Sequence, residues 1–164
     1  MEKLNLMYGS GDVLHTHINI NPFADDADNE KIIRADIKNL DAHVDDAELD
    51  ELVAEDVIDY LPVNEAEKVL DNWLRKIRLG GKIILGGVDL HEVCKALFQY
   101  RIELPEANRL IHGEQNHSYL IRRANFTCSS LADFISQNYN FKIIKKRIND
   151  YKMIVEAKRN ENNN

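Results

Sequence analysis

Glycine and polar residues follow four segments of this chain that are predicted to be β-strands. In a sheet of mainly parallel strands, ligands bind beyond the carboxyl ends of the strands, where the strand order reverses. Residues that directly follow these strands are therefore expected to form one binding cleft. They are Gly9, Ser10 and Gly11 after the first segment, Asn21 after the second, Asp36 after the third, and Glu55 and Asp56 after the fourth.

Each of these residues also has a purely structural interpretation. The sequence Gly9-Ser10-Gly11 is common in turns, and Asp36 could cap the turn after its strand. Glu55 and Asp56 could be first-turn acids that favour a helix N-terminus. The residues alone leave both interpretations open.

The clearest element behind these loops is an amphipathic helix predicted over 65–78. Asn64 is expected to cap its start and Gly80-Gly81 to end it. The unbroken apolar run 83–85 suits a strand covered on both faces, which favours a parallel sheet. The apolar stripe of the helix consists of Ala66, Val69, Leu70, Trp73, Leu74 and Ile77.

The remaining elements complete an α/β pattern. Strands are predicted over 3–7, 17–21, 32–36 and 52–54, and a helix over about 89–100. Segment 105–117 shows little periodicity and is expected to be a loop over the sheet. Ser129 or Ser130 is expected to cap a helix that runs to about Asn138, and strands over 141–147 and 151–157 to form a hairpin around Asn149-Asp150. We expect a doubly wound, Rossmann-like, mostly parallel sheet with a C-terminal antiparallel hairpin.

Length and composition limit the possible classes of protein. With 164 residues, we expect one domain over 1–159 and a polar, disordered tail over 160–164. The formal charge of −7 and the lack of an evident Lys/Arg-rich face argue against a nucleic-acid partner. Cys94 and Cys128 stand far apart, and no histidine pair has a third ligand, so we expect neither a disulfide framework nor a metal site. No apolar run is long enough for a membrane span or signal peptide, which predicts a cytoplasmic protein.

Four motifs in register resemble a known family. They are KLNLMYGSGDVLHTHININ, RADIKNL, LDELVAEDVIDYLP and LRKIRLGGKIIL. In this order and at these separations they are similar to the class I S-adenosylmethionine-dependent methyltransferases, above all to small, often phage- or polysaccharide-associated members. The resemblance covers about 3–90 well, and the closing hairpin also fits.

The resemblance implies S-adenosylmethionine as cofactor and a set of residues that bind it. Gly9, Ser10 and Gly11 would lie against the methionine part of the cofactor. Asn21 would meet the ribose, Asp36 and the backbone of Ile37 the adenine, and Glu55 and Asp56 would line the methyl-donor pocket. A sugar, a small molecule or a protein would be the methyl acceptor. The candidates for a catalytic base are Asp56, Asp89, His91 and His112, and the sequence does not choose among them.

A second hypothesis is a catalytically inactive methyltransferase-like fold that acts as a protein interaction module. Met7 and Tyr8 stand where the family has smaller residues, and Asn21 replaces an acid. In this alternative Tyr8 fills the cofactor space, and the surface near Phe98, Tyr100 and Leu104 packs against a partner.

Overall fold

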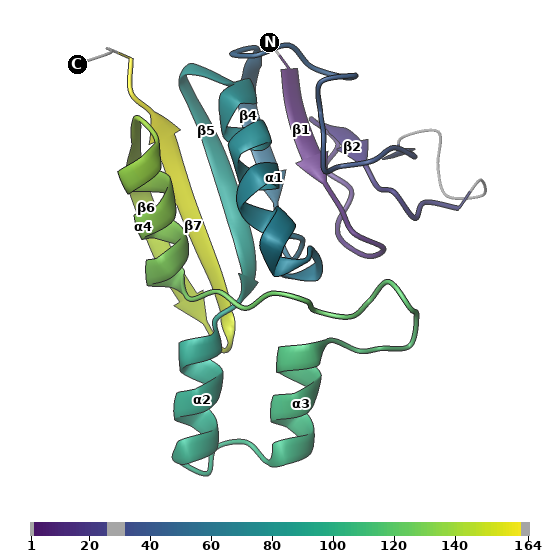
Figure 1. Ribbon diagram of the computed structural model, residues 1–164, viewed down its shortest axis with the longest axis vertical. Helices are drawn as coiled ribbons and strands as arrows, with labels where there is room; N and C mark the ends of the chain where they lie inside the picture. Colours follow the sequence, from purple (N-terminus) through teal and green to yellow (C-terminus); the bar gives the residue numbers. More distant parts are fainter. Residues whose placement is uncertain (1, 26–31, 162–164) are drawn as a thin grey trace.

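The computed structural model describes residues 2–25 and 32–161, which form a seven-stranded sheet with helices (Figure 1). The strand order is β3-β2-β1-β4-β5-β7-β6. The first five strands pair in parallel, whereas β7 is antiparallel to both β5 and β6. The strands are β1 (Glu2–Leu6), β2 (Ile18–Ile20), β3 (Ile32–Ile33), β4 (Leu49–Ala54), β5 (Ile77–Val88), β6 (Phe141–Asn149) and β7 (Lys152–Arg159).

This architecture confirms the predicted fold class, and the strand order reverses between β1 and β4, as expected. Both strands end at the lower edge of the sheet in Figure 1, which the pair α2 (Leu90–Phe98) and α3 (Leu104–His112) faces. The expected single domain over 1–159 stays a prediction. Of the expected tail, 162–164 lie outside the described residues.

The junction between α1 (Val63–Lys76) and β5 differs from the prediction. Pro62, not Asn64, is the N-cap residue, and no side chain caps the helix. The helix ends at Lys76, and Gly80 and Gly81 lie inside β5 instead of ending the helix. A Cβ on Gly81 would stand 2.7 Å from the carbonyl oxygen of Leu49, so this glycine allows β4 and β5 to approach each other.

The segment after β5 contains three helices. Asp89 caps α2 by accepting a hydrogen bond from the Glu92 amide. The expected loop over 105–117 is wrong for its first half, because α3 begins there with Pro105 in its first turn. In α4 (Cys128–Asn138) the cap is Thr127, and Ser130 closes a reciprocal capping box with it.

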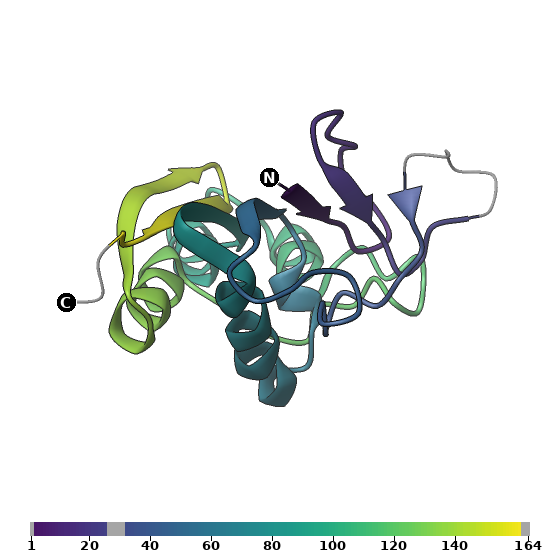
Figure 2. The same cartoon turned by 90° about the horizontal axis from the view of Figure 1, so that it is seen from above.

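Helices α1 and α4 lie on the same side of the sheet (Figure 2) and enclose the main apolar core with it. Among the described residues, 7–17 and 34–48 join strands without forming a helix. The opposite side, which we call the open face, carries a ladder of ion pairs. Lys3 and Lys82 both contact Glu51, at 3.7 and 2.6 Å, and Lys82 also contacts Glu156 at 3.4 Å. This polar face explains how a largely parallel sheet tolerates one side without helices.

No helix within 2–25 and 32–161 has both the length and the apolar character needed to cross a bilayer.

Candidate functional site

A cavity of about 350 Å³ lies at the carboxyl ends of β1 and β4. This volume is within the range of small-molecule sites. Four of the residues predicted from the sequence line it, namely Ser10, Gly11, Glu55 and Asp56. Asp12 and Lys152 also border it, so carboxylates dominate its charged lining. The sequence did not indicate Lys152, because it comes from the far end of the chain.

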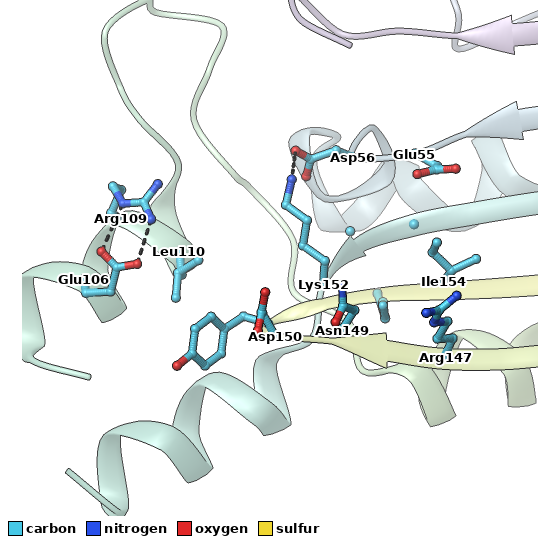
Figure 3. Close-up of a pocket in the computed structure, with 14 residues that line it drawn as sticks. Glu55, Asp56, Glu106, Arg109, Leu110, Arg147, Asn149, Asp150, Lys152 and Ile154 are labelled. Carbon is cyan, nitrogen blue, oxygen red and sulfur yellow. Dashed lines mark hydrogen bonds and ion pairs between the residues drawn. The ribbon is translucent and has the colours of Figure 1, made fainter. Parts of the chain in front are cut away.

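Figure 3 shows residues that line a second cavity, of about 540 Å³, which has lining residues in common with the first. Glu55, Asp56 and Lys152 line both cavities, and the Lys152 ammonium lies 3.5 Å from a carboxylate oxygen of Asp56. Its far wall consists of α3 and the tip of the β6–β7 hairpin. The carboxyl edge of the sheet therefore offers two adjacent compartments with a shared charged boundary.

Asn21 and Gly9 line neither cavity, and they bind each other. The Asn21 side-chain oxygen accepts hydrogen bonds from the amides of Gly9, at 3.0 Å, and Phe23, at 3.1 Å. Asn21 is buried, with 4% of its surface exposed. The amide thus fastens the loop after β1 to the end of β2, and its oxygen is used by the backbone.

Asp36 and Ile37 also lie away from the cavities. A carboxylate oxygen of Asp36 accepts a hydrogen bond from the Lys38 amide at 2.9 Å, which is the turn-capping role that the sequence left open. The Ile37 side chain is buried in the core, and its carbonyl oxygen accepts a hydrogen bond from the Trp73 indole at 2.7 Å. The structure therefore brings together four of the eight predicted residues.

The segments that follow β1, β2, β4 and α3 contribute an aromatic cluster. It consists of Tyr8, Phe23, Tyr60 and Tyr119. The Tyr8 ring stacks on Tyr60 with centroids 5.3 Å apart and meets Phe23 edge-on at 4.8 Å. Phe23 in turn stacks on Tyr119 at 4.0 Å. Tyr8 therefore packs against protein side chains in the region between the loops after β1, β2 and β4.

Replacing Gly9 with alanine should destabilise this loop. Gly9 has a φ of 77°, and a Cβ there would stand 2.6 Å from the Tyr119 ring. We expect a loss of about 1–3 kcal/mol in the free energy of unfolding, measured in urea. Ser10→Ala, at the exposed next position, is the control and should cost less than about 0.5 kcal/mol. Equal midpoints for both variants would contradict the packing of Tyr119 on Gly9.

A buried ion pair that the sequence did not indicate joins the segment after α3 to the segment after β4. The Arg122 guanidinium contacts the carboxylates of Asp59 and Asp56 and lies 4.7 Å above the Tyr60 ring. The side chains of Asp59 and Arg122 are 2% and 8% exposed. The Asp59 carbonyl also accepts hydrogen bonds from the amides of Arg123 and Ala124. These contacts fasten the segment after α3 across the carboxyl edge of the sheet.

The two carboxylates beside Arg122 have opposite electrostatic environments. Burial raises the pKa of Asp59 to about 6, although Arg122 opposes the shift. Burial also disfavours ionised Asp56, but its contacts with Arg122 and Lys152 outweigh this and lower its pKa. Near neutral pH Asp56 is ionised, whereas Asp59 gains its proton under mildly acidic conditions.

Asp59 should therefore make stability depend on pH. Because its pKa is raised from 3.8 to about 6, its favourable contribution is complete below pH 3.8 and is lost as the pH rises through 6. Between pH 4 and 7 we expect the wild-type protein to lose up to about 3 kcal/mol relative to Asp59→Asn. Chemical denaturation at several pH values measures this difference, and parallel curves for the two proteins would contradict it.

The other candidates for a catalytic base lie outside the cavities. Asp89 is buried and accepts hydrogen bonds from the amides of Glu92 and Cys128, so its carboxylate caps α2 and binds the first amide of α4. His91 and His112 are exposed and line neither cavity. Asp56 is the one of these four that borders both compartments. Across the described ranges, no three His, Cys, Asp or Glu side chains are grouped as metal ligands.

No protein-family model and no curated protein sequence matches this chain. Solved structures do match its fold. A structure described as SAM-dependent methyltransferases from Methanosarcina mazei aligns with a TM-score of 0.63 and 12% identity, over 97% of this chain and 92% of that one. The 1,6-didemethyltoxoflavin-N1-methyltransferase of Burkholderia thailandensis, crystallised with 1,6-didemethyltoxoflavin and S-adenosylhomocysteine, gives 0.58 and 9%, over 96% and 71%.

An O-methyltransferase family protein from Burkholderia thailandensis aligns with a TM-score of 0.63 and 10% identity over 99% of this chain. The chain spans only 52% of that protein. At such identities the likeness concerns the path of the backbone. The chain has the fold of the S-adenosylmethionine-dependent methyltransferases.

Proposed function

We propose that this protein binds S-adenosylmethionine in the cavity between β1 and β4 and transfers its methyl group to an acceptor in the adjoining cavity. The observation that carries the proposal is the set of four predicted residues, Ser10, Gly11, Glu55 and Asp56, around one cavity of suitable size. The fold of the matching structures supports the same location, because ligands of such sheets bind at the carboxyl edge.

The charges of this cavity fit the cofactor. When bound, S-adenosylmethionine supplies a methyl group on a cationic sulfur, and it also carries an ammonium group. Asp12 and Glu55 would offer carboxylates to these two positive groups, whereas the Asp56 carboxylate already contacts Arg122 and Lys152. Lys152 would hold the cofactor carboxylate, and the exposed glycine Gly11 leaves room beside the backbone.

The neighbouring cavity would hold the acceptor. Its wall combines apolar surface from Leu110, Met153 and Ile154 with polar groups of the hairpin tip. Because the two cavities share Glu55 and Asp56, an acceptor nucleophile in one would lie beside the methyl group in the other. Positioning would then supply most of the catalysis. Asp56 would orient the acceptor, since its lowered pKa makes it a weak base. A sugar, a small molecule or a protein side chain is the proposed acceptor.

Calorimetric titration with S-adenosylhomocysteine tests the cofactor site. We expect micromolar binding to the wild-type protein and about tenfold weaker binding to Glu55→Gln, because a charged contact becomes neutral. Glu67→Gln, the same change on the exposed surface of α1, is the matched control. Asp36→Ala should also bind normally, because Asp36 lies away from the cavity.

Two results would overturn this proposal. One is the absence of binding to the wild-type protein at millimolar ligand. The other is loss of binding in Asp36→Ala with normal binding in Glu55→Gln, which would move the site to the end of β3.

The interaction module is a second candidate, and two observations favour it. Tyr8 packs against Phe23 and Tyr60 next to the loop that begins the proposed cofactor site. Phe98 and Tyr100 are 83% and 91% exposed at the end of α2. If Tyr8 closes the cofactor site, Tyr8→Ala should bind S-adenosylhomocysteine more tightly than the wild-type protein does. Unchanged affinity would remove this support for the module.

A further inference from the structure

The β6–β7 hairpin concentrates positive charge in an acidic protein. Residues 141–159 contain seven Lys and Arg and two Asp and Glu, whereas the whole chain contains 21 and 28. The expectation that the chain has no Lys/Arg-rich face stays a prediction, but this hairpin departs from the average composition of the chain. This cluster of cations is not evident in the sequence. Successive side chains of a strand point to opposite sides, so cations that share one side are separated along the chain.

The cations of β6 are also unpaired. Lys142, Lys145, Lys146 and Arg147 are exposed, and none of their side chains has a hydrogen-bond or ion-pair partner within 2–25 and 32–161. Elsewhere in the same structure many cations contact carboxylates, as Lys3, Lys38, Lys76, Lys82, Arg75, Arg109 and Arg122 do. Since acidic residues are in excess, the absence of partners along one strand is a distinctive feature of that strand.

The strand register places like charges directly opposite one another. Lys82 pairs with Lys158 on β7, and Lys158 pairs with Lys142 on β6. Directly opposed like charges destabilise a sheet, so this row has a cost for folding. Lysine on an edge strand also discourages sheet-to-sheet aggregation. Protection of the edge requires charge on β6, but it does not require Lys158 on the neighbouring strand β7.

The row leads from one hollow to another along the open face. Lys142 and Lys158 border a hollow of about 450 Å³, together with Arg159. Lys145 lies opposite Glu156, and Arg147 lies opposite Ile154 and lines the 540 Å³ cavity at the hairpin tip. We call Lys142, Lys145 and Arg147 the β6 track; Lys158 lies beside it on β7 and contacts Glu161 at 3.4 Å. Figure 2 shows α4 on the other side of this hairpin, so the helix does not cover the track.

We propose that the β6 track binds the phosphodiester backbone of a single-stranded nucleic acid. Lys145 and Arg147 are alternate residues of β6, and such residues lie about 6.6–6.8 Å apart, which is comparable to the spacing of successive phosphates in an extended single strand. Lys142 precedes them on the same side, across the register shift between Ile143 and Lys145. Unpaired lysine and arginine neutralise phosphates without reading base sequence. A single row of cations along one strand suits one backbone rather than the two of a duplex. The proposal does not depend on methyl transfer.

Fluorescence anisotropy with a labelled 20-nucleotide oligouridine at low salt tests the track. We expect saturable binding that weakens as salt rises, with a log–log slope of about −2 to −3 for three to four phosphate contacts. The variant Lys142→Gln/Lys145→Gln/Arg147→Gln should bind at least tenfold more weakly, with a flatter slope. The matched control Lys68→Gln/Arg101→Gln/Arg123→Gln removes the same charge from other exposed positions and should bind normally.

Several outcomes would overturn the proposal. They are no binding of the oligonucleotide at 20 mM salt, equal losses in the two triple variants, tighter binding of a duplex of the same length, and equally effective competition by polyglutamate. Circular dichroism and urea midpoints of both variants show whether they fold, and all the substituted side chains are exposed.

Discussion

Replacing Trp73 with alanine should lower the free energy of unfolding by about 3–5 kcal/mol. Trp73 is fully buried at the centre of the core between α1 and the sheet. Its indole nitrogen donates a 2.7 Å hydrogen bond to the carbonyl of Ile37, which would lose its partner in the variant. Because small proteins have total stabilities of about 5–15 kcal/mol, this change should leave the protein close to unfolding.

Urea denaturation followed by circular dichroism measures this effect, since Trp73 is the one tryptophan and cannot serve as a fluorescence probe in its own variant. Trp73→Phe keeps most of the apolar volume and loses the hydrogen bond, so it should cost clearly less than the alanine variant. A cost below about 1.5 kcal/mol for Trp73→Ala would contradict the central position of this side chain.

Replacing Arg122 with methionine should lower the free energy of unfolding by a similar amount, about 3–5 kcal/mol at pH 8. The substitution leaves the buried carboxylate of Asp59 without its cation. Near pH 5 the cost should be smaller, since Asp59, with a pKa of about 6, can then take up a proton. Urea unfolding at the two pH values gives both numbers.

Arg123→Met is the matched control, because the neighbouring side chain is exposed and only its backbone amide contacts Asp59. It should change stability by less than about 0.5 kcal/mol at either pH. If Arg122→Met costs the same at pH 5 and pH 8, the buried charge of Asp59 is not the cause of its effect.

The amphipathic helix and the apolar run of β5 could be predicted because each follows the period of its own element. The boundary between them could not. Gly80-Gly81 has the form of a helix end, yet β5 begins at Ile77, where it pairs with Leu49 of β4. The strand register of a distant segment decides this boundary, and a local pattern does not contain it. Helix α3 was missed although Pro105 in its first turn is a recognised start signal.

The candidate site was half predictable for a similar reason. Strand ends identify Ser10, Gly11, Glu55 and Asp56, because topology alone brings them to one edge. Arg122 lies 63 positions beyond Asp59 and in a segment without periodicity, so their pairing follows only from the folded chain. The roles of Asn21 and Asp36 depend on whether their side chains bind the backbone or a ligand, and the sequence does not distinguish these two possibilities.

The place of β7 between β5 and β6 affects the order in which the chain can fold. During synthesis, β5 pairs with β4 on one side, but its other neighbour is formed by residues 152–159. Until these emerge from the ribosome, the backbone of Ile83 to Val88 has an unpaired edge beside an incomplete core. An exposed edge of this kind is prone to pair with other chains. Ribosome-bound chains that stop before β7 should therefore depend on chaperones more than the finished chain does.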